Sequence, residues 1–533
     1  MSQKFDFIIV GAGTAGCLLA NRLSENGKHS VALIEAGGSD NYHWIHIPVG
    51  YLYCMGNKRT DWLFKTTAQN GLNGRSLNYP RGKVMGGCSS INGMIYMRGQ
   101  ANDYDQWRQM GNQGWGWDDV LPFFTKMEDN YDGKNQFHGV GGEWKVEQQR
   151  LSWDVLDSFQ DATVEAGIPK IEDFNEGNNY GVSYFKVNQK SGFRWNAVKA
   201  FIKPIKERKN LQIISKCEVN KLIIENKKVV GVEVSRNGAL EKILVNKEVI
   251  LSAGSIGSPK ILELSGIGNP KILSNLGIDT KVESNNVGEN LQDHLQLRVI
   301  YKLENAKTLN QRANSVFGKM AIALEYALKR TGPMSMAPSQ LGVFAMSDSS
   351  YETPNLQFHV QPLSLDKFGD PLHGFPGLTA SVCNLNPQSR GSVHIVSKDN
   401  KEAPSIDPRY LSEEQDRIVA AQSIRLARKI ISQPAMKKYN PIEHAPGIQF
   451  QSDEDLKKVA GDIGTTIFHP VGTCAMGSNS SSVTDPQLRV RGIQGLRVVD
   501  ASIMPTVTSG NTNAPTLMIA EKASEMILNS NKF

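Results

Sequence analysis

The sequence predicts an α/β protein in two parts, a doubly wound Rossmann-like domain and a second domain with an antiparallel sheet and helices. The first part is predicted by a short apolar strand, Phe5–Val10, that runs directly into the glycine turn GAGTAG and then into a helix. The second part is predicted by several segments in which polar and apolar residues alternate, as they do in strands with one buried face.

The first domain opens with a strand–helix–strand unit. After the glycine turn, Cys17–Leu23 is predicted as a helix and Ser30–Glu35 as a second buried strand. Strand-like runs between Leu211 and Ala253 predict a small meander and a strand that returns to this sheet. The run LRVVDASIMP and a helix from about Pro515 add the C-terminal stretch to the same domain.

The second domain is predicted to be split in the sequence. Its antiparallel strands are expected in residues 295–303, 354–362, 378–386 and 391–397. Between the first two of these strands, Val316–Lys329 has the pattern of an amphipathic helix. We therefore expect the first domain in residues 1–155, 190–290 and 456–533, and the second in residues 156–189 and 291–455.

The bulk composition is that of a soluble globular protein. The 533 residues are 40% hydrophobic and 21% charged, and the formal net charge of +6 is mild for this length. No dense Lys/Arg run points to nucleic acid, although a weak attraction to an anionic membrane surface stays open. Six scattered cysteines without a CxxC pair, no signal-peptide pattern and no long apolar run predict a cytoplasmic protein with reduced thiols.

The glycine turn carries the pattern GxGxxG, in which each glycine has a separate task. Gly11 permits the tight turn, Gly13 lets the backbone approach a pyrophosphate, and Gly16 lets the helix pack closely on the strand. Glu35 ends the second strand about 20 residues later, where an acidic side chain binds a ribose hydroxyl. An acid at this position argues against a 2′-phosphate, so the turn predicts FAD or NAD rather than NADP.

Four further blocks, in order along the chain, distinguish these cofactors. They are Gly82–Asn92 with Tyr96, Gly99 and Asp105; Gly254–Gly268; Val287–His294; and the C-terminal group HPVGT, VDAS and NAPT. Together they resemble the glucose–methanol–choline (GMC) oxidoreductases, and most closely the bacterial choline-dehydrogenase-like and aliphatic alcohol dehydrogenases. Met85 and Cys88 are mild departures from the first family pattern.

The resemblance implies an FAD-binding first domain and a substrate-binding second domain, and it implies no metal. Some family members attach the flavin to a histidine directly before the Asn of the first block, and Ile91 occupies that position here, so we expect non-covalent FAD. The residues expected at the cofactor are Gly11, Gly13, Thr14, Ala15, Gly16, Glu35, Ala36, Trp62, Arg81, Met85, Gly86, Gly87, Ser90, Asn92, Gly93, Met94, Ile95, Val219, Ala253, Gly254, Asp500, Ala501, Asn511, Thr512 and Ala514.

The same resemblance implies the oxidation of a primary alcohol to an aldehyde by hydride transfer to flavin N5. His469 is expected to act as the general base, because an imidazole of ordinary pKa can take a hydroxyl proton while hydride leaves the carbon. Asn513 is expected as the second catalytic group, since an amide can hydrogen-bond the same oxygen. Asn513 is also placed to cap the helix that follows it.

Several alternatives stay open at this stage. The electron acceptor is a quinone-type carrier, which makes a dehydrogenase, or O2, which makes an oxidase that releases H2O2. A flavin photodecarboxylase or hydroxynitrile lyase of the same fold is disfavoured by the presence of both His469 and Asn513, and a purely flavin-binding role is the last alternative.

The substrate is expected to enter between the two domains. The strand in residues 354–362 and the segment 316–336 are expected at the entrance, where Phe317, Met320, Leu324, Met334 and Met336 suit an aliphatic or aromatic alcohol. The sequence leaves equally open that these apolar residues form the core of a packed helix. The same apolar helix predicts a peripheral contact with the inner face of the cytoplasmic membrane, as a source of quinone. The alcohol and the oligomeric state are not determined by the sequence.

Overall fold

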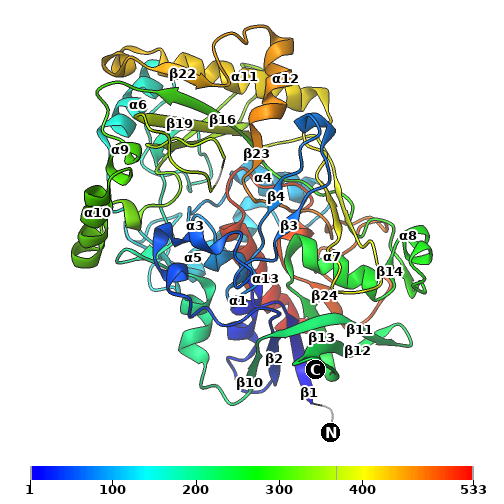
Figure 1. The fold of residues 1–533 in the computed structure, drawn as a ribbon. Helices are drawn as coiled ribbons and strands as arrows, with labels where there is room; N and C mark the ends of the chain where they lie inside the picture. The colour runs from blue at the N-terminus through cyan, green and yellow to red at the C-terminus, as the bar shows by residue number, and fades with distance from the viewer. Residues whose placement is uncertain (1–2, 368, 531–533) are drawn as a thin grey trace.

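Two seven-stranded sheets form the frame of the structure, a computed structural model that describes residues 3–367 and 369–530. Figure 1 shows one sheet at the bottom of the view and the other at the top, with helices on both. Segments from the start, middle and end of the chain meet between the two sheets. The predicted two-part α/β architecture is confirmed.

The lower sheet has the strand order β10-β2-β1-β13-β12-β11, and β24 pairs with β13. The central pairs are parallel, whereas β11, β12 and β13 form the predicted antiparallel meander. The bounds of these strands are β1 (Lys4–Val10), β2 (Val31–Ile34), β10 (Leu211–Ile214), β11 (Cys217–Glu225), β12 (Lys228–Arg236), β13 (Ala239–Leu251) and β24 (Leu496–Val498).

A helix from the start of the chain packs on this sheet, and a helix from its end packs on the first one. Helix α1 (Thr14–Leu23) is buried along its whole length, and it contacts β1, β2 and α13 (Asn513–Ser530). Helix α7 (Gly254–Leu264) follows β13 directly. The apolar residues of β1, β2, β13, α1 and α13 share one large core. Because α1 and α13 touch, the last helix reaches the loop that follows the first strand.

The upper sheet is antiparallel, with the order β22-β16-β19-β18-β17-β7 and with β23 paired to β16. Helices α6 (Asp154–Glu165), α11 (Glu414–Ile431) and α12 (Asp453–Ile463) share its apolar core. The strand bounds are β7 (Gly181–Tyr184), β16 (Leu295–Lys302), β17 (Leu341–Ala345), β18 (Leu356–Gln361), β19 (Gly377–Asn384), β22 (Ile442–Ala445) and β23 (Gly464–Thr466).

Alternation along β16 and β18 gives this sheet two different faces. Leu297, Val299 and Tyr301 belong to the core beneath the helices. The residues between them point the other way, and Gln296 and Arg298 line a cavity between the two sheets. The upper sheet therefore presents polar side chains to the lower domain.

Two expectations about the second domain need adjustment. Among the described strands, β20 (Ser392–His394) pairs with β21 (Ser405–Asp407) in a separate two-stranded sheet, so the segment 391–397 does not join the large sheet. Beyond the predicted limit at residue 455, α12 continues to pack on α11, and β23 pairs with β16. The second layer thus extends past the predicted limit before the chain returns to the lower domain.

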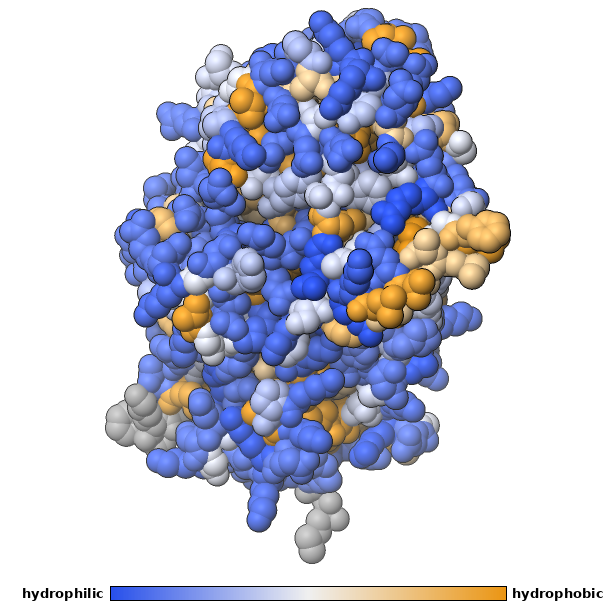
Figure 2. Space-filling model, turned by 90° about the vertical axis from the view of Figure 1, so that its left-hand side faces the viewer, coloured by the Kyte–Doolittle hydropathy of each residue, from blue (hydrophilic) through white to orange (hydrophobic). Residues whose placement is uncertain are grey.

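Helix α10 (Val316–Lys329) has the predicted bounds, but its widest apolar face points outward. Ile322 and Tyr326 are buried against the protein, whereas five large apolar side chains are between 60% and 84% exposed. These five form the α10 ridge: Val316, Phe317, Met320, Leu324 and Leu328. Figure 2 shows hydrophobic side chains gathered in a protrusion at the right of the view, at the height of α10.

The other elements are mostly shorter. They are α2 (His43–His46), α3 (Tyr51–Cys54), α4 (Ala101–Gln109), α5 (Trp117–Met127), α8 (Pro270–Asn275), α9 (Leu309–Ala313), β3 (Phe64–Lys65), β4 (Asn78–Tyr79), β5 (Glu128–Asn130), β6 (Trp144–Val146), β8 (Gln189–Lys190), β9 (Phe193–Arg194), β14 (Ile267–Gly268) and β15 (Val282–Glu283).

Candidate active site

A cavity of about 770 Å³ runs between the two sheets. At one end it is lined by the loops that follow β1, β2 and β13, which are the carboxyl ends of parallel strands, where doubly wound sheets bind their ligands. At the other end it reaches His469, Asn511 and His359. One continuous space therefore connects the glycine turn with the predicted base.

The three glycines of the turn have different surroundings. Gly11 has a φ of 100°, and a Cβ there would lie 2.5 Å from the carbonyl oxygen of Ser252. A Cβ at Gly13 would meet nothing within 4 Å, because this residue borders the cavity. A Cβ at Gly16 would clash with the carbonyl oxygen of Gly11, so this glycine allows the helix to pack.

The first turn of α1 is suited to bind an anion. Its N-cap residue is Gly13, which has no side chain to accept the free backbone N–H groups. These groups and the positive end of the helix dipole face the cavity where a pyrophosphate would lie. A dinucleotide fits the residues present at this end.

Glu35 also lies on the cavity wall. Its carboxylate accepts hydrogen bonds from the backbone N–H of Ala12 and of Gly37, both at 2.8 Å. Burial raises the pKa of Glu35 to about 7, and the two N–H donors oppose that rise. The carboxylate thus ties the glycine turn to the end of β2.

Most of the predicted cofactor residues line this one cavity. Five do not: Gly16, Met85, Gly86, Ser90 and Ala514. Those in the first block support the wall from behind, since Gly86 N donates to Ala12 O at 2.7 Å and Ser90 Oγ donates to Met85 O at 2.8 Å. The predicted cofactor residues on the wall are Gly11, Gly13, Thr14, Ala15, Glu35, Ala36, Trp62, Arg81, Gly87, Asn92, Gly93, Met94, Ile95, Val219, Ala253, Gly254, Asp500, Ala501, Asn511 and Thr512.

His469 is held by a carboxylate that the sequence analysis did not single out. The backbone N–H of His469 donates to Asp293 Oδ1 at 2.7 Å. The other oxygen of Asp293 accepts hydrogen bonds from Tyr79, Thr466 and Tyr410. Asp293 therefore fixes the loop that carries the histidine. Asp293 belongs to the block Val287–His294, and the match of this block to the family pattern could have pointed to it.

The hydrogen bonds around His469 determine which ring nitrogen carries the proton. His294 Nε2 lies 3.1 Å from Leu385 O, a pure acceptor, so Nε2 carries the hydrogen and Nδ1 of neutral His294 accepts. That Nδ1 lies 3.0 Å from His469 Nδ1, which must therefore donate. His469 Nε2 is then unprotonated, and it faces the Asn511 amide nitrogen at 3.1 Å. The positions of the protons on His294 and His469 are thus assigned from their hydrogen-bond partners.

The surroundings also keep this histidine neutral. Burial, followed by the neighbouring His294, His359 and Arg81, holds the pKa of His469 well below its ordinary value. His359, on β18, faces the same cavity, and burial lowers its pKa to about 3. A neutral imidazole with an unprotonated Nε2 can accept a proton from a hydroxyl group in the cavity.

The two asparagines near the end of the chain differ from the expected arrangement. Asn511, predicted only as a cofactor residue, is the one whose amide meets His469. Asn513, predicted as the second catalytic group, instead accepts a hydrogen bond from Thr14 Oγ1 at 2.8 Å. The reason is local, because Asn513 is the first residue of α13, and this helix packs on α1. Asn511 precedes the helix and reaches across to the histidine.

Both asparagines leave a buried polar atom without a hydrogen bond. These atoms are Asn511 Oδ1 and Asn513 Nδ2, which have no partner among the described residues. Each residue lines the cavity. A flat heteroaromatic ring with donors and acceptors on its edge would satisfy such atoms, so the residues present fit a flavin.

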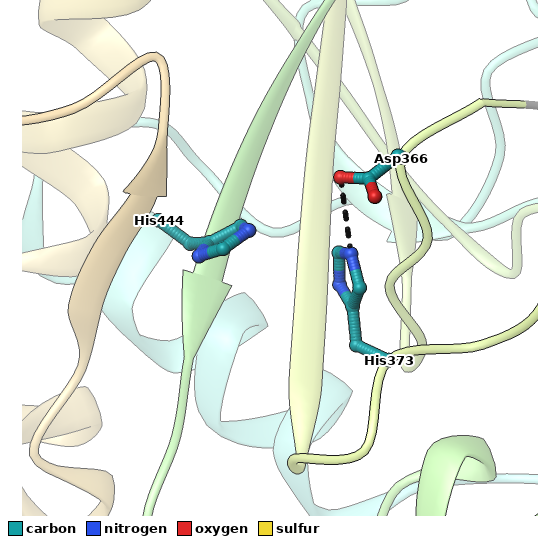
Figure 3. Close-up of side chains that lie close together, drawn as sticks. All are labelled: Asp366, His373 and His444. Atoms are coloured by element: carbon teal, nitrogen blue, oxygen red, sulfur yellow. Dashed lines mark hydrogen bonds and ion pairs between the residues drawn. The ribbon is translucent and has the colours of Figure 1, made fainter.

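A group of two histidines and a carboxylate lies outside the cavity wall. Asp366, His373 and His444 offer ligand atoms within 4.8 Å of one another. Figure 3 shows His373 pointing at Asp366, and its Nε2 lies 3.2 Å from Asp366 Oδ1 while its Nδ1 lies 3.0 Å from Ser364 Oγ. Because both ring nitrogens of His373 are engaged, we assign this group the task of holding its loop.

Comparisons with known proteins cover almost the whole chain. The family profile described as GMC oxidoreductase matches residues 5–296 with its N-terminal part and residues 387–520 with its C-terminal part. An alcohol dehydrogenase [acceptor] of Pseudomonas putida is 40% identical over 98% of this chain and 96% of its own length. An oxygen-dependent choline dehydrogenase of Vibrio vulnificus (strain YJ016) is 39% identical over 99% of this chain and 95% of its own length.

Solved structures agree with these matches. Pyridoxine 4-oxidase from "Mesorbium loti" superimposes with a TM-score of 0.89 at 30% identity, covering 98% of both chains. A variant of formate oxidase from Aspergillus oryzae RIB40 superimposes with a TM-score of 0.93 at 27% identity, covering 100% of this chain and 99% of its own. The fold around the cavity is shared across these proteins.

Proposed function

The chain belongs to the GMC oxidoreductase family and is an FAD-dependent enzyme that acts on CH–OH donors, and we propose that it oxidises a primary alcohol to the aldehyde. The observation that carries this proposal is the neutral His469, whose unprotonated Nε2 stands beside the Asn511 amide at the end of the cofactor cavity. FAD supplies the hydride acceptor, its N5 atom, when it is bound.

In this proposal His469 Nε2 takes the hydroxyl proton and Asn511 hydrogen-bonds the same oxygen. An alcohol is far less acidic than an imidazolium ion, and each pK unit of the mismatch costs about 1.4 kcal/mol. Full ionisation of the alcohol before the carbon is oxidised would therefore be slow. We propose that the proton leaves as the carbon gives up its hydride, with Asn511 stabilising the partial negative charge on oxygen.

We propose that Asn513 acts on the cofactor side instead. Its bond to Thr14 holds the N-terminus of α13 beside the glycine turn. The positive end of α13 then faces the cavity, where it would favour negative charge on the reduced ring. We also propose that FAD is held without a covalent bond, because the buried side chain of Ile91 has no atom that can bond to flavin. The mass of the denatured polypeptide tests this point.

We propose that the natural electron acceptor is a quinone-type carrier, which makes the protein a dehydrogenase. This is supported by the similarity to an alcohol dehydrogenase [acceptor]. O2 remains the competing acceptor, and H2O2 formed during turnover would identify an oxidase. A photodecarboxylase or lyase would need no net oxidation of an alcohol, and turnover that depends on light would identify the former.

The α10 ridge supports a contact with a membrane surface. Five of the six charged residues between positions 307 and 330 are basic, so the apolar ridge is flanked by positive charge that suits anionic lipid. Lys319 and Ile322 of the same helix line the cavity. We propose that the ridge enters the lipid interface peripherally, at the cytoplasmic face. Among the described residues, no helix is long and apolar enough to span a bilayer.

Anaerobic flavin bleaching tests the main proposal. Primary alcohols should bleach the FAD of the wild type, and His469→Ala should slow the reduction at least 100-fold, because proton transfer by a positioned base contributes about 10²–10⁴-fold. FAD content serves as the control, since His469 lies away from the glycine turn. Reduction at the wild-type rate in the variant, or no reduction by any alcohol, would contradict the proposal.

A further inference from the structure

Arg298 lies at the far end of the cavity from the glycine turn. It is the fourth residue of β16, on the polar face of the upper sheet, and it lines the cavity together with Gln296, His359 and Gln361. In the register of the sheet, Arg298 and His359 both pair with Ser381 of the strand between them. Arg298 therefore stands two strands away from His359, or about 10 Å across the sheet.

In the part of the chain that the structure describes, no carboxylate forms an ion pair with the guanidinium of Arg298. Its Nε and Nη2 atoms are closed to solvent and have no hydrogen-bond partner among the described residues. The groups that act on its charge are Tyr51 and Asp366, and the Asp366 carboxylate bonds His373 at 3.2 Å. Burial lowers the pKa of Arg298 to about 10, so the group is still charged at neutral pH.

Another arginine, Arg428, shows how the Nε and Nη2 atoms of a guanidinium bind a carboxylate. The Nε and Nη2 atoms of Arg428 hold the two oxygens of Glu443, at 2.8 Å each. These two nitrogens form one edge of the guanidinium, and their spacing matches a carboxylate. At Arg298 the same edge has no carboxylate, and a buried charge left without a partner is costly. The described residues therefore leave this edge of the Arg298 guanidinium without the anion that it could bind.

We propose that Arg298 binds the carboxylate of the alcohol substrate, so that the enzyme acts on a hydroxycarboxylate. This inference rests on the proposed function, because it takes the hydroxyl end to lie at His469. Arg298 lies four positions after His294, which is about 13 Å along an extended chain. The arginine side chain spans part of this distance. The substrate would then have its carboxylate at Arg298, its hydroxyl at His469 and a carbon chain between the two groups.

The surroundings support this polarity. His359 and Gln361 lie on the same sheet face and line the cavity, and their atoms His359 Nδ1 and Gln361 Oε1 have no hydrogen-bond partner among the described residues. Part of the Arg298 side chain reaches the cavity, and the substrate carboxylate would meet the unpaired edge after a rotation of the guanidinium. A quaternary ammonium group such as that of choline would meet a positive charge at this end. The subsite therefore favours an anion and opposes a cation.

The test compares alcohols that differ only in charge. With the FAD-loaded enzyme under anaerobic conditions, ω-hydroxycarboxylates of increasing chain length are compared with their methyl esters and with choline. The acids should reduce the flavin at lower concentration than the esters, and choline should be the poorest. Arg298→Met should raise the KM for the acids about 10- to 100-fold and leave the KM for the esters nearly unchanged.

Two further variants and one binding measurement complete the test. Lys302→Met removes one positive charge from an exposed position of the same strand, and it should leave the preference unchanged. Arg298→Lys keeps the charge but loses the paired edge, and it should give an intermediate KM if the Met variant fails to fold. A non-oxidisable aliphatic carboxylate should perturb the flavin absorbance of the wild type and of Lys302→Met, but not of Arg298→Met.

The outcomes separate this inference from the proposed function. If esters bleach the flavin but the acids are no better and carboxylates do not bind, the role of Arg298 is wrong while alcohol oxidation stands. Choline as the best substrate would also overturn the inference. If no alcohol of any charge bleaches the flavin, the proposed function itself fails.

Discussion

At the scale of single residues, the chemistry depends on which nitrogen of His469 is free. The residue type and its family block were visible in the sequence, and they predicted a base. Its neighbours were not predictable, because Asp293, His294 and Leu385 are brought to it by strands of the upper sheet far away in sequence. The sequence also could not decide between Asn511 and Asn513, which lie two positions apart and have the same side chain.

The two asparagines can be separated by matched substitutions. Asn511→Ala should slow flavin reduction about 100-fold or more, because one donor to a developing oxyanion is worth about 10²–10³ in rate. Asn513→Ala should mainly weaken FAD binding, since it breaks the link to Thr14. Stopped-flow reduction and equilibrium FAD titration measure the two effects. Slow flavin reduction in Asn513→Ala, together with weak FAD binding in Asn511→Ala, would show instead that Asn513 is the catalytic asparagine.

The lowered pKa of His469 predicts a pH profile. The unprotonated ring is the active form, and its pKa lies below the ordinary value of about 6.5, so protonation removes activity only at more acidic pH. We expect kcat/KM for flavin reduction to stay level from about pH 8 to 6.5 and to fall below that. An acid limb centred above pH 7 would show that the bound cofactor raises this pKa instead.

At the scale of elements, the glycine turn and helix α1 were predicted closely. A buried strand, a GxGxxG turn and a helix are local features, and their geometry follows from backbone conformation. The strand in residues 391–397 was assigned to the wrong sheet, because alternation indicates a strand but not its partner. Helix α10 had the right bounds, but sequence alone could not tell that its apolar face is exposed.

Two alanine substitutions in the turn should affect different properties, one FAD binding and the other the stability of the fold. Gly13→Ala should fold, because its methyl group meets no protein atom, but it should weaken FAD binding by intruding on the pyrophosphate space. Gly16→Ala should destabilise the fold by several kcal/mol, since the new methyl group overlaps the Gly11 carbonyl. Thermal unfolding without FAD and FAD titration distinguish them. Equal stability of both variants would contradict this assignment of roles.

At the scale of the whole molecule, the two-part fold and the family were predictable, because the motifs run in order from one end of the chain to the other. The polar face of the upper sheet was harder to foresee, because alternation does not reveal which face meets a cofactor domain. Arg298 is an example, because in the sequence it is a single charged residue within an alternating strand, and nothing there shows that it borders the cavity.

The orientation of the molecule at a membrane can be tested with vesicles. The wild type should co-sediment with vesicles that contain phosphatidylglycerol more than with phosphatidylcholine alone. Phe317→Glu combined with Leu324→Glu should abolish binding, because charged residues cannot enter the lipid interface. Leu240→Glu changes a side chain of similar exposure, 69%, on another element and should have no effect. Light scattering that shows a dimer broken by the double variant would instead make the α10 ridge a self-association surface.

The chain of hydrogen bonds behind His469 has a kinetic consequence. It ends at the carbonyl oxygen of Leu385, which cannot take up a proton at any physiological pH. A proton captured by His469 therefore has no relay into the protein interior and must leave by the way it came, through the cavity. While the aldehyde blocks that route, the histidine cannot reset. Release of the product and release of the proton should thus be a single gated event, and turnover in D2O should slow at this late step as well as at the oxidation itself.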